Sequence, residues 1–260
     1  PSVLAASANV ISQLLPDRFV MGLGSSSQTI MGQWNGIPLD NPLTRVKETA
    51  QLVRTMLSGD KTDFDGETLY SRGYRQAPLE NPPPIYLAAL RSSMVEMAAE
   101  FGDGVIFNLW PKKALPKMME HVRIGAERAG KDPESVEIVN RAMVLCTNDK
   151  ARGRDMFRAQ FAPYYATPVY NNFLSWAGYE DAADTISEGW AEKDRAKTSG
   201  AMTDAMIDEI GIIGSKEEIQ DRIREDAEGG VHTHIIAPLG GDPEDVHNTL
   251  NAFSADEFQF

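Results

Sequence analysis

Hydrophobic and polar positions along this chain form blocks that repeat in one order, a short apolar run followed by an amphipathic stretch. The apolar runs have the length and continuity of strands buried on both faces. The stretches between them carry apolar residues at helical spacing. Strand followed by helix, repeated in this way, predicts an α/β fold with a parallel sheet covered on both sides. The runs are residues 18–24, 85–89, 104–109, 136–145 and 233–237.

Local signals place the helix ends and one hairpin. Helices are expected over residues 2–15, 44–58 and 114–129, the second ending at Gly59. Ser93 with Glu96, and Ser215 with Glu218, have the spacing of capping boxes, and Asp242-Pro243 is typical of a helix start. Residues 64–69 contain Asp65-Gly66 and predict a small β-hairpin.

Residues 151–200 interrupt the repeating order. This interval holds nine of the 21 aromatic residues and is too long for a simple crossover between strands. We therefore expect a helical insertion here. A lid or subunit contact is the functional interpretation, and ordinary core packing of extra helices is the structural one; the sequence leaves both open.

The composition argues against several classes of protein. The 260 residues carry 38 Asp and Glu against 25 Lys and Arg, a net charge of −13, which disfavours binding to nucleic acids or anionic membranes. No apolar run reaches the roughly 18 residues of a membrane span. A single cysteine, Cys146, leaves no internal disulfide and suits a cytoplasmic protein. The chain is expected to form one domain over residues 1–260.

Two loops at strand ends are candidates for anion binding. Residues 22–27 run from a strand into glycine and serines, but they lack the third glycine of a dinucleotide fingerprint. Residues 88–93 combine small side chains, Arg91 and a helix start, whose free N–H groups favour an anion. His232 and His234 share one strand face without a nearby third ligand, so we expect no metal site. No nucleophilic catalytic motif is present, which is typical of a protein whose chemistry comes from an organic cofactor.

Several short motifs occur in one order and together are similar to a known family. With them, the chain resembles the luciferase-like monooxygenase superfamily, in particular its oxidoreductases that use the deazaflavin coenzyme F-420. The likeness spans nearly the whole chain. The motifs are residues 18–24, 33–38, Arg45-x-x-Glu48, 65–66, 84–89, 103–106 and 173–179, followed by Trp190 and Asp194-Arg195.

The resemblance implies a (β/α)8 TIM barrel with a helical insertion after its seventh strand, which suits the aromatic interval. In the family, three strand–helix units precede the motif that begins at Arg18. Those units carry residues that contact the cofactor ring, and often the proton donor, so the resemblance implies that the first three units are absent here. Catalytic residues therefore stay unassigned.

Site residues implied by the resemblance lie at three strand ends. Gly24, Ser25 and Ser26 match the loop near the cofactor's ribityl chain and phosphate. Asn108 and Trp110 would face the cofactor or substrate pocket. The loop after the family's fifth strand often carries glycines, and Leu90 and Arg91 depart from that pattern. The residues that match it are Ala88, Ala89, Leu90 and Arg91.

The resemblance implies hydride transfer between coenzyme F-420 and a small organic substrate, within a homodimer. One alternative is an FMN-dependent monooxygenase of the same superfamily. Another is a non-catalytic barrel that acts only in binding or subunit interaction.

Overall fold

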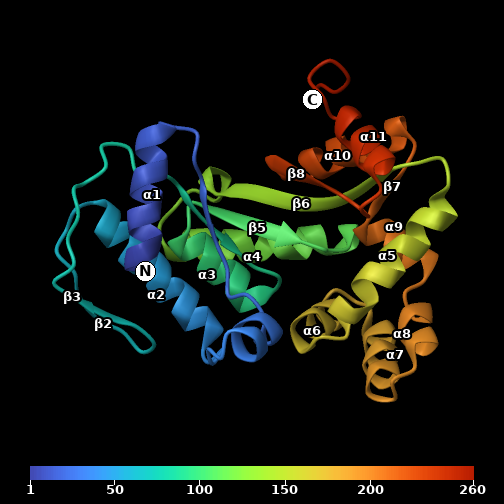
Figure 1. Ribbon diagram of the computed structural model, residues 1–260, viewed down its shortest axis with the longest axis horizontal. Helices are drawn as coiled ribbons and strands as arrows, with labels where there is room; N and C mark the ends of the chain where they lie inside the picture. The colour runs from blue at the N-terminus through green and yellow to red at the C-terminus, as the bar shows by residue number, and fades with distance from the viewer. The chain divides into compact units, whose positions relative to one another are not determined.

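The structure is a computed structural model that describes residues 1–260. The chain folds into two compact units (Figure 1). Unit 1 comprises residues 1–106 and 120–137. Unit 2 comprises residues 107–119 and 138–260. Each unit has its own strands, helices and buried residues and is described by itself.

Three parallel strands form the sheet of unit 1, with β4 (Ile85–Ala88) between β1 (Met21–Leu23) and β5 (Gly104–Asn108). The register pairs Leu23 with Leu87 and Leu87 with Val105. Leu87 and Val105 are fully buried, as expected for a parallel sheet covered on both faces. Strand β1 is shorter than predicted, since residues 18–20 lie outside it and Val20 is exposed.

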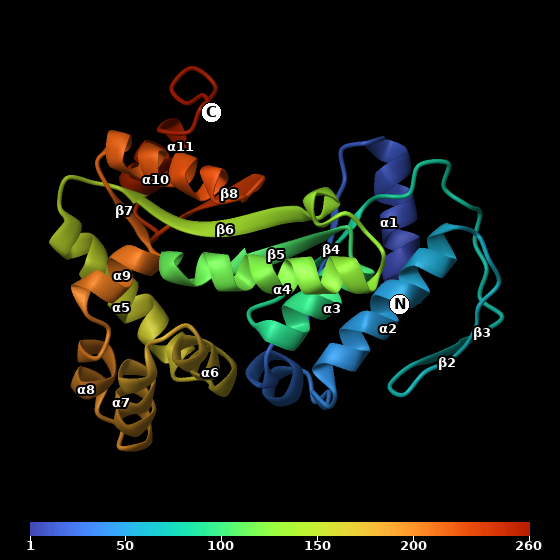
Figure 2. The ribbon, with the colours of Figure 1, turned by 180° about the vertical axis from the view of Figure 1, so that it is seen from behind.

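The helices of unit 1 are α1 (Ser2–Leu14), α2 (Pro42–Leu57), α3 (Ser92–Phe101) and the latter part of α4 (Leu115–Arg128). Helix α1 packs against α2, as Figure 2 shows from behind, and α2 also contacts α3. A π-helix, η1 (Thr29–Trp34), follows β1 and was not predicted. Helix α2 begins two residues before the predicted start because Pro42 suits a first-turn position.

The predicted hairpin consists of β2 (Asp63–Asp65) and β3 (Tyr70–Arg72). Its turn lies over Glu48 of α2, whose buried carboxylate accepts hydrogen bonds from the backbone of Glu67, Thr68 and Leu69 at 2.6, 2.9 and 2.9 Å. The Thr68 hydroxyl donates a fourth bond at 2.6 Å. The hairpin is therefore held to α2 by one carboxylate.

In unit 2, the long strand β6 (Glu137–Cys146) pairs in parallel with β7 (Ile212–Gly214) and β8 (Thr233–Pro238). Helices α10 (Lys216–Glu228) and α11 (Pro243–Asn251) pack on one face of these strands. The capping box of Ser215 and Glu218 and the N-cap at Asp242 are both confirmed. Strand β7 was missed by the sequence analysis because its apolar run is only three residues long.

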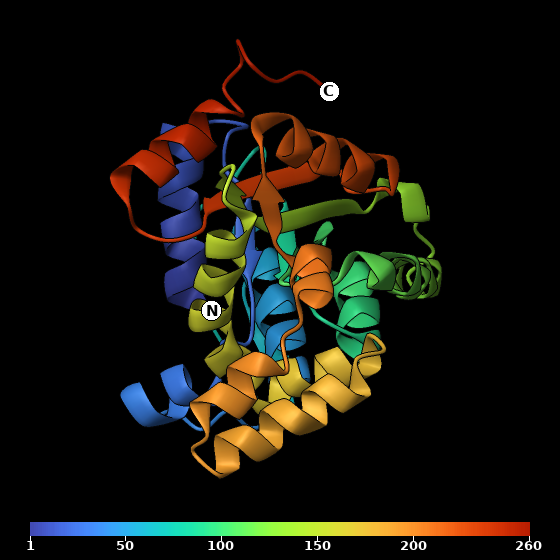
Figure 3. The same cartoon turned by 90° about the vertical axis from the view of Figure 1, so that its right-hand side faces the viewer.

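Residues 151–200, the aromatic interval, are helical, as predicted, and the run of helices continues to Ile210. The helices are α5 (Lys150–Tyr165), α6 (Pro168–Trp176), α7 (Glu180–Ala191), α8 (Arg195–Gly200) and α9 (Asp204–Ile210), seen in yellow to orange in Figure 3. Phe157, Tyr165 and Phe173 are fully buried within the unit, whereas Tyr164 and Trp190 are about half exposed. Core packing thus accounts for much of the aromatic content.

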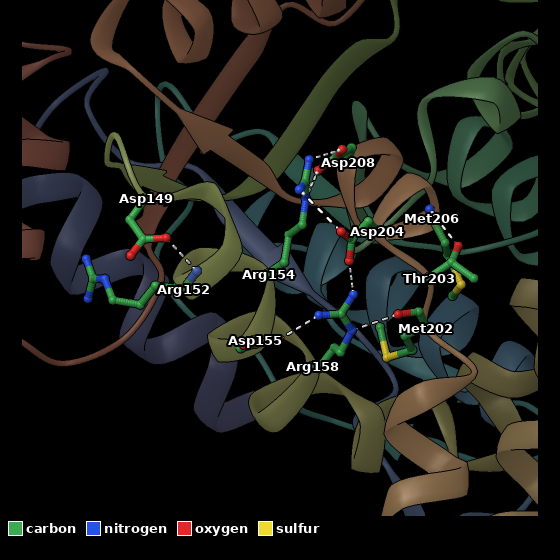
Figure 4. Close-up of polar contacts among 10 residues, drawn as sticks. All are labelled: Asp149, Arg152, Arg154, Asp155, Arg158, Met202, Thr203, Asp204, Met206 and Asp208. Carbon is green, nitrogen blue, oxygen red and sulfur yellow. Dashed lines mark hydrogen bonds and ion pairs between the residues drawn. The ribbon is translucent and has the colours of Figure 1, made fainter.

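Ion pairs hold α5 to α9 (Figure 4). Arg154 pairs with Asp208 at 2.6 Å and with Asp204 at 3.3 Å. Arg158 pairs with the same Asp204 and donates to the Met202 carbonyl at 2.8 Å. Both guanidinium groups are about one-fifth exposed, so these pairs are screened less than those of a fully exposed surface.

The predicted capping box of Ser93 and Glu96 is wrong. Helix α3 begins at Ser92 with Arg91 as its N-cap, and no side chain caps it. Glu96 is instead bound by His121 and Arg128, each at 2.8 Å, and the Arg128 hydrogen bond is the main reason that the pKa of Glu96 lies below its usual value. The Glu96 carboxylate therefore forms ion pairs with residues distant in the sequence instead of capping α3.

No helix has the length and apolar character that crossing a membrane requires.

Candidate functional site

Two loops predicted from the sequence lie side by side in unit 1. Because β1 and β4 are parallel neighbours in register, their carboxyl ends place Gly24 beside Ala88. A Cβ on Gly24 would lie 3.2 Å from the Cβ of Ala88, so a side chain here would crowd the neighbouring loop. The structure thus brings Gly24 next to Ala88, where the two predicted loops leave the carboxyl ends of these strands.

The second loop ends in the uncapped start of α3. The N–H groups of Met94 and Val95 both bond to the Arg91 carbonyl, at 3.0 and 3.4 Å. No side chain caps the first turn, and the helix dipole favours negative charge at this end. The Arg91 side chain is exposed and no acidic side chain of the protein pairs with it. The N–H groups left in this turn are those of Ser92 and Ser93, and with Arg91 they form a candidate oxyanion site.

Backbone strain is present in both loops. Ser26 has a φ of +61° and Ser92 a φ of +26°, in a region that non-glycine residues rarely adopt. Such strain persists where surrounding structure imposes it, and it often occurs at ligand-binding sites. Leu109, just after β5 in unit 2, is a third such residue, with a φ of +52°.

Ala89 and Leu90 carry apolar side chains. The Ala89 side chain is buried, and its N–H donates to the Ile106 carbonyl at 3.1 Å. That N–H is therefore not free for a ligand. Leu90 is partly buried and offers an apolar wall rather than a charged or hydroxyl group.

Trp110 lies in the interior of unit 2. Its indole is 3% exposed, packs edge-on to Phe107, and donates to the Asn140 side chain at 2.9 Å. Asn140 in turn contacts Asp226, whose pKa is raised by burial despite its ion pair with Arg222. The polar end of Trp110 is thus bonded within the protein, and only its rings remain to line a pocket.

Asn108 lies at the end of β5 between two polar side chains. Its amide donates to the Tyr170 hydroxyl of α6 at 3.0 Å, and its oxygen accepts from Arg141 of β6 at 3.3 Å. Neither Arg141 nor Tyr170 is among the site residues predicted from the sequence. One signal was available: Arg141 is the only cation within the ten residues of β6.

The loop after β5 is also bonded to the aromatic helices of unit 2. The Tyr165 hydroxyl donates to the strained Leu109 carbonyl at 2.7 Å. Lys113 lies 3.5 Å from the ring centroid of Tyr179, and Lys117 lies 4.0 Å from that of Trp176. The helices that follow β6 therefore fix the position of the Asn108 loop.

A polar cavity of about 790 Å³ lies elsewhere in unit 2, at the starts of α10 and α11. Cys146 lines it with Arg152, which pairs with Asp245 at 2.7 Å. Burial raises the pKa of the Cys146 thiol, so the group is a poor nucleophile. No predicted site residue lines this cavity.

Comparison with known proteins decides the family. The sequence profile of the family described as luciferase-like monooxygenase matches residues 1–233. The chain belongs to the luciferase-like monooxygenase family. Among solved structures, this family member is similar to the coenzyme F-420-dependent tetrahydromethanopterin reductase from Methanopyrus kandleri (TM-score 0.75, 18% identity, 96% of this chain and 78% of that one). An F-420-dependent secondary alcohol dehydrogenase gives a TM-score of 0.76 at 14% identity, over 100% of this chain and 76% of that one.

These structural likenesses show an α/β fold of the luciferase-like TIM-barrel type, with a parallel sheet. Among curated proteins, the luciferase-like chain is 27% identical over 248 residues to the 5,10-methylenetetrahydromethanopterin reductase of Archaeoglobus fulgidus, covering 93% of this chain and 74% of that protein. It is 31% identical over 153 residues to the F-420-dependent glucose-6-phosphate dehydrogenase of Mycolicibacterium gilvum, covering 53% and 43%. The missing barrel units, the single domain and the site assignments stay predictions.

Proposed function

We propose that this luciferase-like protein binds coenzyme F-420 and takes part in hydride transfer between that cofactor and a small organic substrate. The observation that carries the proposal is that two loops of unit 1, after β1 and β4, lie side by side at the carboxyl ends of these strands. Relatives named for F-420, found by both sequence and structure, support the choice of cofactor.

The residues present fit the phosphate end of such a cofactor. Gly24 has no side chain where a Cβ would meet Ala88, so a ligand can approach the backbone there. Ser25 and Ser26 would offer hydroxyl and amide donors, and the start of α3 would offer the N–H groups of Ser92 and Ser93. Arg91 would supply the positive charge. The bound deazaflavin supplies the ring carbon that carries the hydride.

The chain's own contribution is binding and orientation. The surrounding structure keeps Ser26 and Ser92 at positive φ, so the two loops are ordered before a ligand binds and little ordering is needed on binding. Within unit 2, Asn108 and the rings of Trp110 would contact the substrate. The half-exposed Trp190 and Tyr164 offer a surface for a second copy of the chain, which we propose forms a homodimer.

Cofactor titrations test the proposal. F-420 and FMN are each titrated into the protein, and binding is followed by the change in cofactor fluorescence. We expect F-420 to bind more tightly than FMN. Arg91→Ala should weaken F-420 binding by about 10- to 100-fold, because a lost charge-assisted hydrogen bond costs about 1.5–3 kcal/mol. Lys61→Ala removes an exposed charge elsewhere in unit 1 and serves as the matched control.

Each outcome has a defined meaning. An Arg91→Ala affinity within twofold of the unsubstituted protein contradicts the phosphate role of Arg91. Tighter binding of FMN, with oxygen consumption on reduction, would replace the proposal with an FMN-dependent monooxygenase. Binding of neither cofactor by the protein would favour the non-catalytic alternative.

A further inference from the structure

Three side chains of unit 2 that come from separate elements form one hydrogen-bonded group, here called the donor cluster: Arg141, Asn108 and Tyr170. Arg141 Nη1 lies 3.3 Å from Asn108 Oδ1, and Asn108 Nδ2 lies 3.0 Å from the Tyr170 hydroxyl. Strand β6, the end of β5 and helix α6 each supply one member. All three belong to the same compact unit.

The direction of these hydrogen bonds is fixed by chemistry. A guanidinium group can only donate, so the Asn108 atom that faces it must be the amide oxygen. The Asn108 nitrogen then donates to the Tyr170 oxygen, which acts as the acceptor. The phenol proton of Tyr170 must point elsewhere, and no acceptor in the protein takes it. The cluster thus ends in a free O–H donor.

Two nitrogen atoms of the Arg141 guanidinium group have no hydrogen-bond partner in the protein. Nη1 is used by Asn108 and by a 3.2 Å contact with the sulfur of Met143, whereas Nε and Nη2 have no partner in the protein. No carboxylate pairs with Arg141, although five other arginines of unit 2 form ion pairs with Asp or Glu. Its charge is therefore not neutralised by a carboxylate of the protein, although the chain has 38 acidic and 25 basic residues.

The position of Arg141 keeps these donors open to a ligand. Successive side chains of a strand alternate between its faces, so Val139 and Met143 share the face of Arg141. Both are 3% exposed, whereas Arg141 is exposed. The guanidinium group therefore lies where an otherwise buried strand face opens to solvent.

Tyr170 is held firmly and stays protonated. Its ring packs edge-on against Tyr165 and Tyr164, with centroids 5.9 and 5.5 Å apart. Burial raises its pKa above the ordinary value of 10, and this effect exceeds the opposite effect of the Asn108 hydrogen bond. At neutral pH the hydroxyl is a donor.

We propose that the donor cluster binds an oxyanion, a carboxylate or phosphate group, on the substrate. Two unused donor groups, one of them positively charged, with no free acceptor between them, match a negatively charged oxygen ligand. This inference rests on the proposed function, because it names the class of substrate that the cofactor-bound protein would act on. It narrows that class to small organic acids and phosphate esters.

Isothermal titration calorimetry of the full chain tests the inference without cofactor. Benzoate and inorganic phosphate are the probes, and they distinguish carboxylate from phosphate recognition. We expect at least one probe to bind, and Arg141→Gln to weaken that binding at least tenfold. Tyr170→Phe should weaken it severalfold, because the free O–H is lost. Lys193→Gln removes an exposed charge of the same unit and should leave binding unchanged.

Asn108→Asp is a second test that does not depend on removing Arg141. It places a carboxylate against the guanidinium group, so the charge is satisfied internally and both probes should lose binding. Circular dichroism confirms that each variant is folded. Failure of the unsubstituted protein to bind either probe, or full binding by Arg141→Gln or by Asn108→Asp, overturns the inference. Since F-420 binding is measured separately, failure of the cofactor proposal is distinguishable from failure of this one.

Discussion

Glu48 offers the sharpest test of how unit 1 is held together. Its side chain is 5% exposed and accepts four hydrogen bonds from the turn of the β2–β3 hairpin. Glu48→Gln keeps the size of the side chain but replaces one acceptor oxygen with an NH2 donor. Three of the four donors face Oε2, so the glutamine oxygen should turn toward them. The new NH2 group would then face the Glu67 N–H, donor against donor.

The expected magnitude follows from these four bonds. One buried N–H left without an acceptor costs about 1–3 kcal/mol. Three bonds that lose their charge assistance cost about 1 kcal/mol each. Added together, these give about 4–6 kcal/mol as an upper bound, because bonds to a shared acceptor are not independent. We expect the free energy of unfolding to fall by at least about 2 kcal/mol.

The loss should depend on pH. Burial alone raises the pKa of Glu48, but the hydrogen bonds from Thr68, Glu67 and Leu69 outweigh it, and the net pKa lies below the ordinary 4.5. A carboxyl group with a lowered folded-state pKa stabilises the protein above its unfolded-state pKa. That contribution is lost as the pH falls below 4.5 through the folded-state pKa. The difference between the unsubstituted protein and Glu48→Gln should therefore shrink in acid.

Urea unfolding at several pH values gives the magnitude, and hydrogen exchange at the amides of residues 67–69 localises the effect. Glu67→Gln is the matched control, because Glu67 is exposed and accepts only one side-chain hydrogen bond, from Asn41. We expect it to change stability by less than about 0.5 kcal/mol. Equal losses for the two variants, or a Glu48→Gln loss that does not change between pH 7 and pH 3, would refute the reasoning.

Two further predictions concern close packing and a buried titratable group. Gly125→Ala should destabilise unit 1 by more than about 3 kcal/mol in urea unfolding, because a Cβ there would overlap the backbone carbonyl of Glu96. Burial lowers the pKa of His234 from 6.5 to about 4, and neither of its ring nitrogens has a hydrogen-bond partner. Since the unfolded chain takes up this proton first, stability should fall as the pH drops from about 6.5 to about 4. His234→Leu should lack that part of the pH dependence.

Matched variants show whether these reasons are correct. Gly200→Ala meets no atom within 4 Å and should change stability by less than about 0.5 kcal/mol. A Gly125→Ala loss no larger than this would mean that α3 and α4 separate at little cost. His247→Gln, at an exposed position, should retain the acid sensitivity. If His234→Leu retains it as well, the buried imidazole is not its source.

Much of the secondary structure follows from local sequence. The apolar runs at residues 85–88 and 104–108 are strands, and Ser215 with Glu218 caps a helix, because burial on both faces and helix capping depend on residues close together in the chain. The same reasoning failed at Glu96. Arg128 lies 32 residues away and takes the carboxylate that a local cap would have used.

The candidate site residues of each unit show the same division. Small residues and a helix start made the loops after β1 and β4 recognisable in the sequence, and the parallel register then placed them together. Arg141 and Tyr170 gave no comparable local pattern, because their significance lies in their contact with Asn108, 33 and 62 residues away.

The sequence by itself determined most of the strands and helices, and which loops after strands are candidates for anion binding, since periodicity and capping are local properties. Only the tertiary structure decided that three polar side chains from β5, β6 and α6 share one hydrogen-bonded group with donors left over. The physical reason is that hydrogen-bond satisfaction depends on which distant elements pack together. From the sequence alone, an unpaired arginine in an apolar strand cannot be distinguished from a paired one.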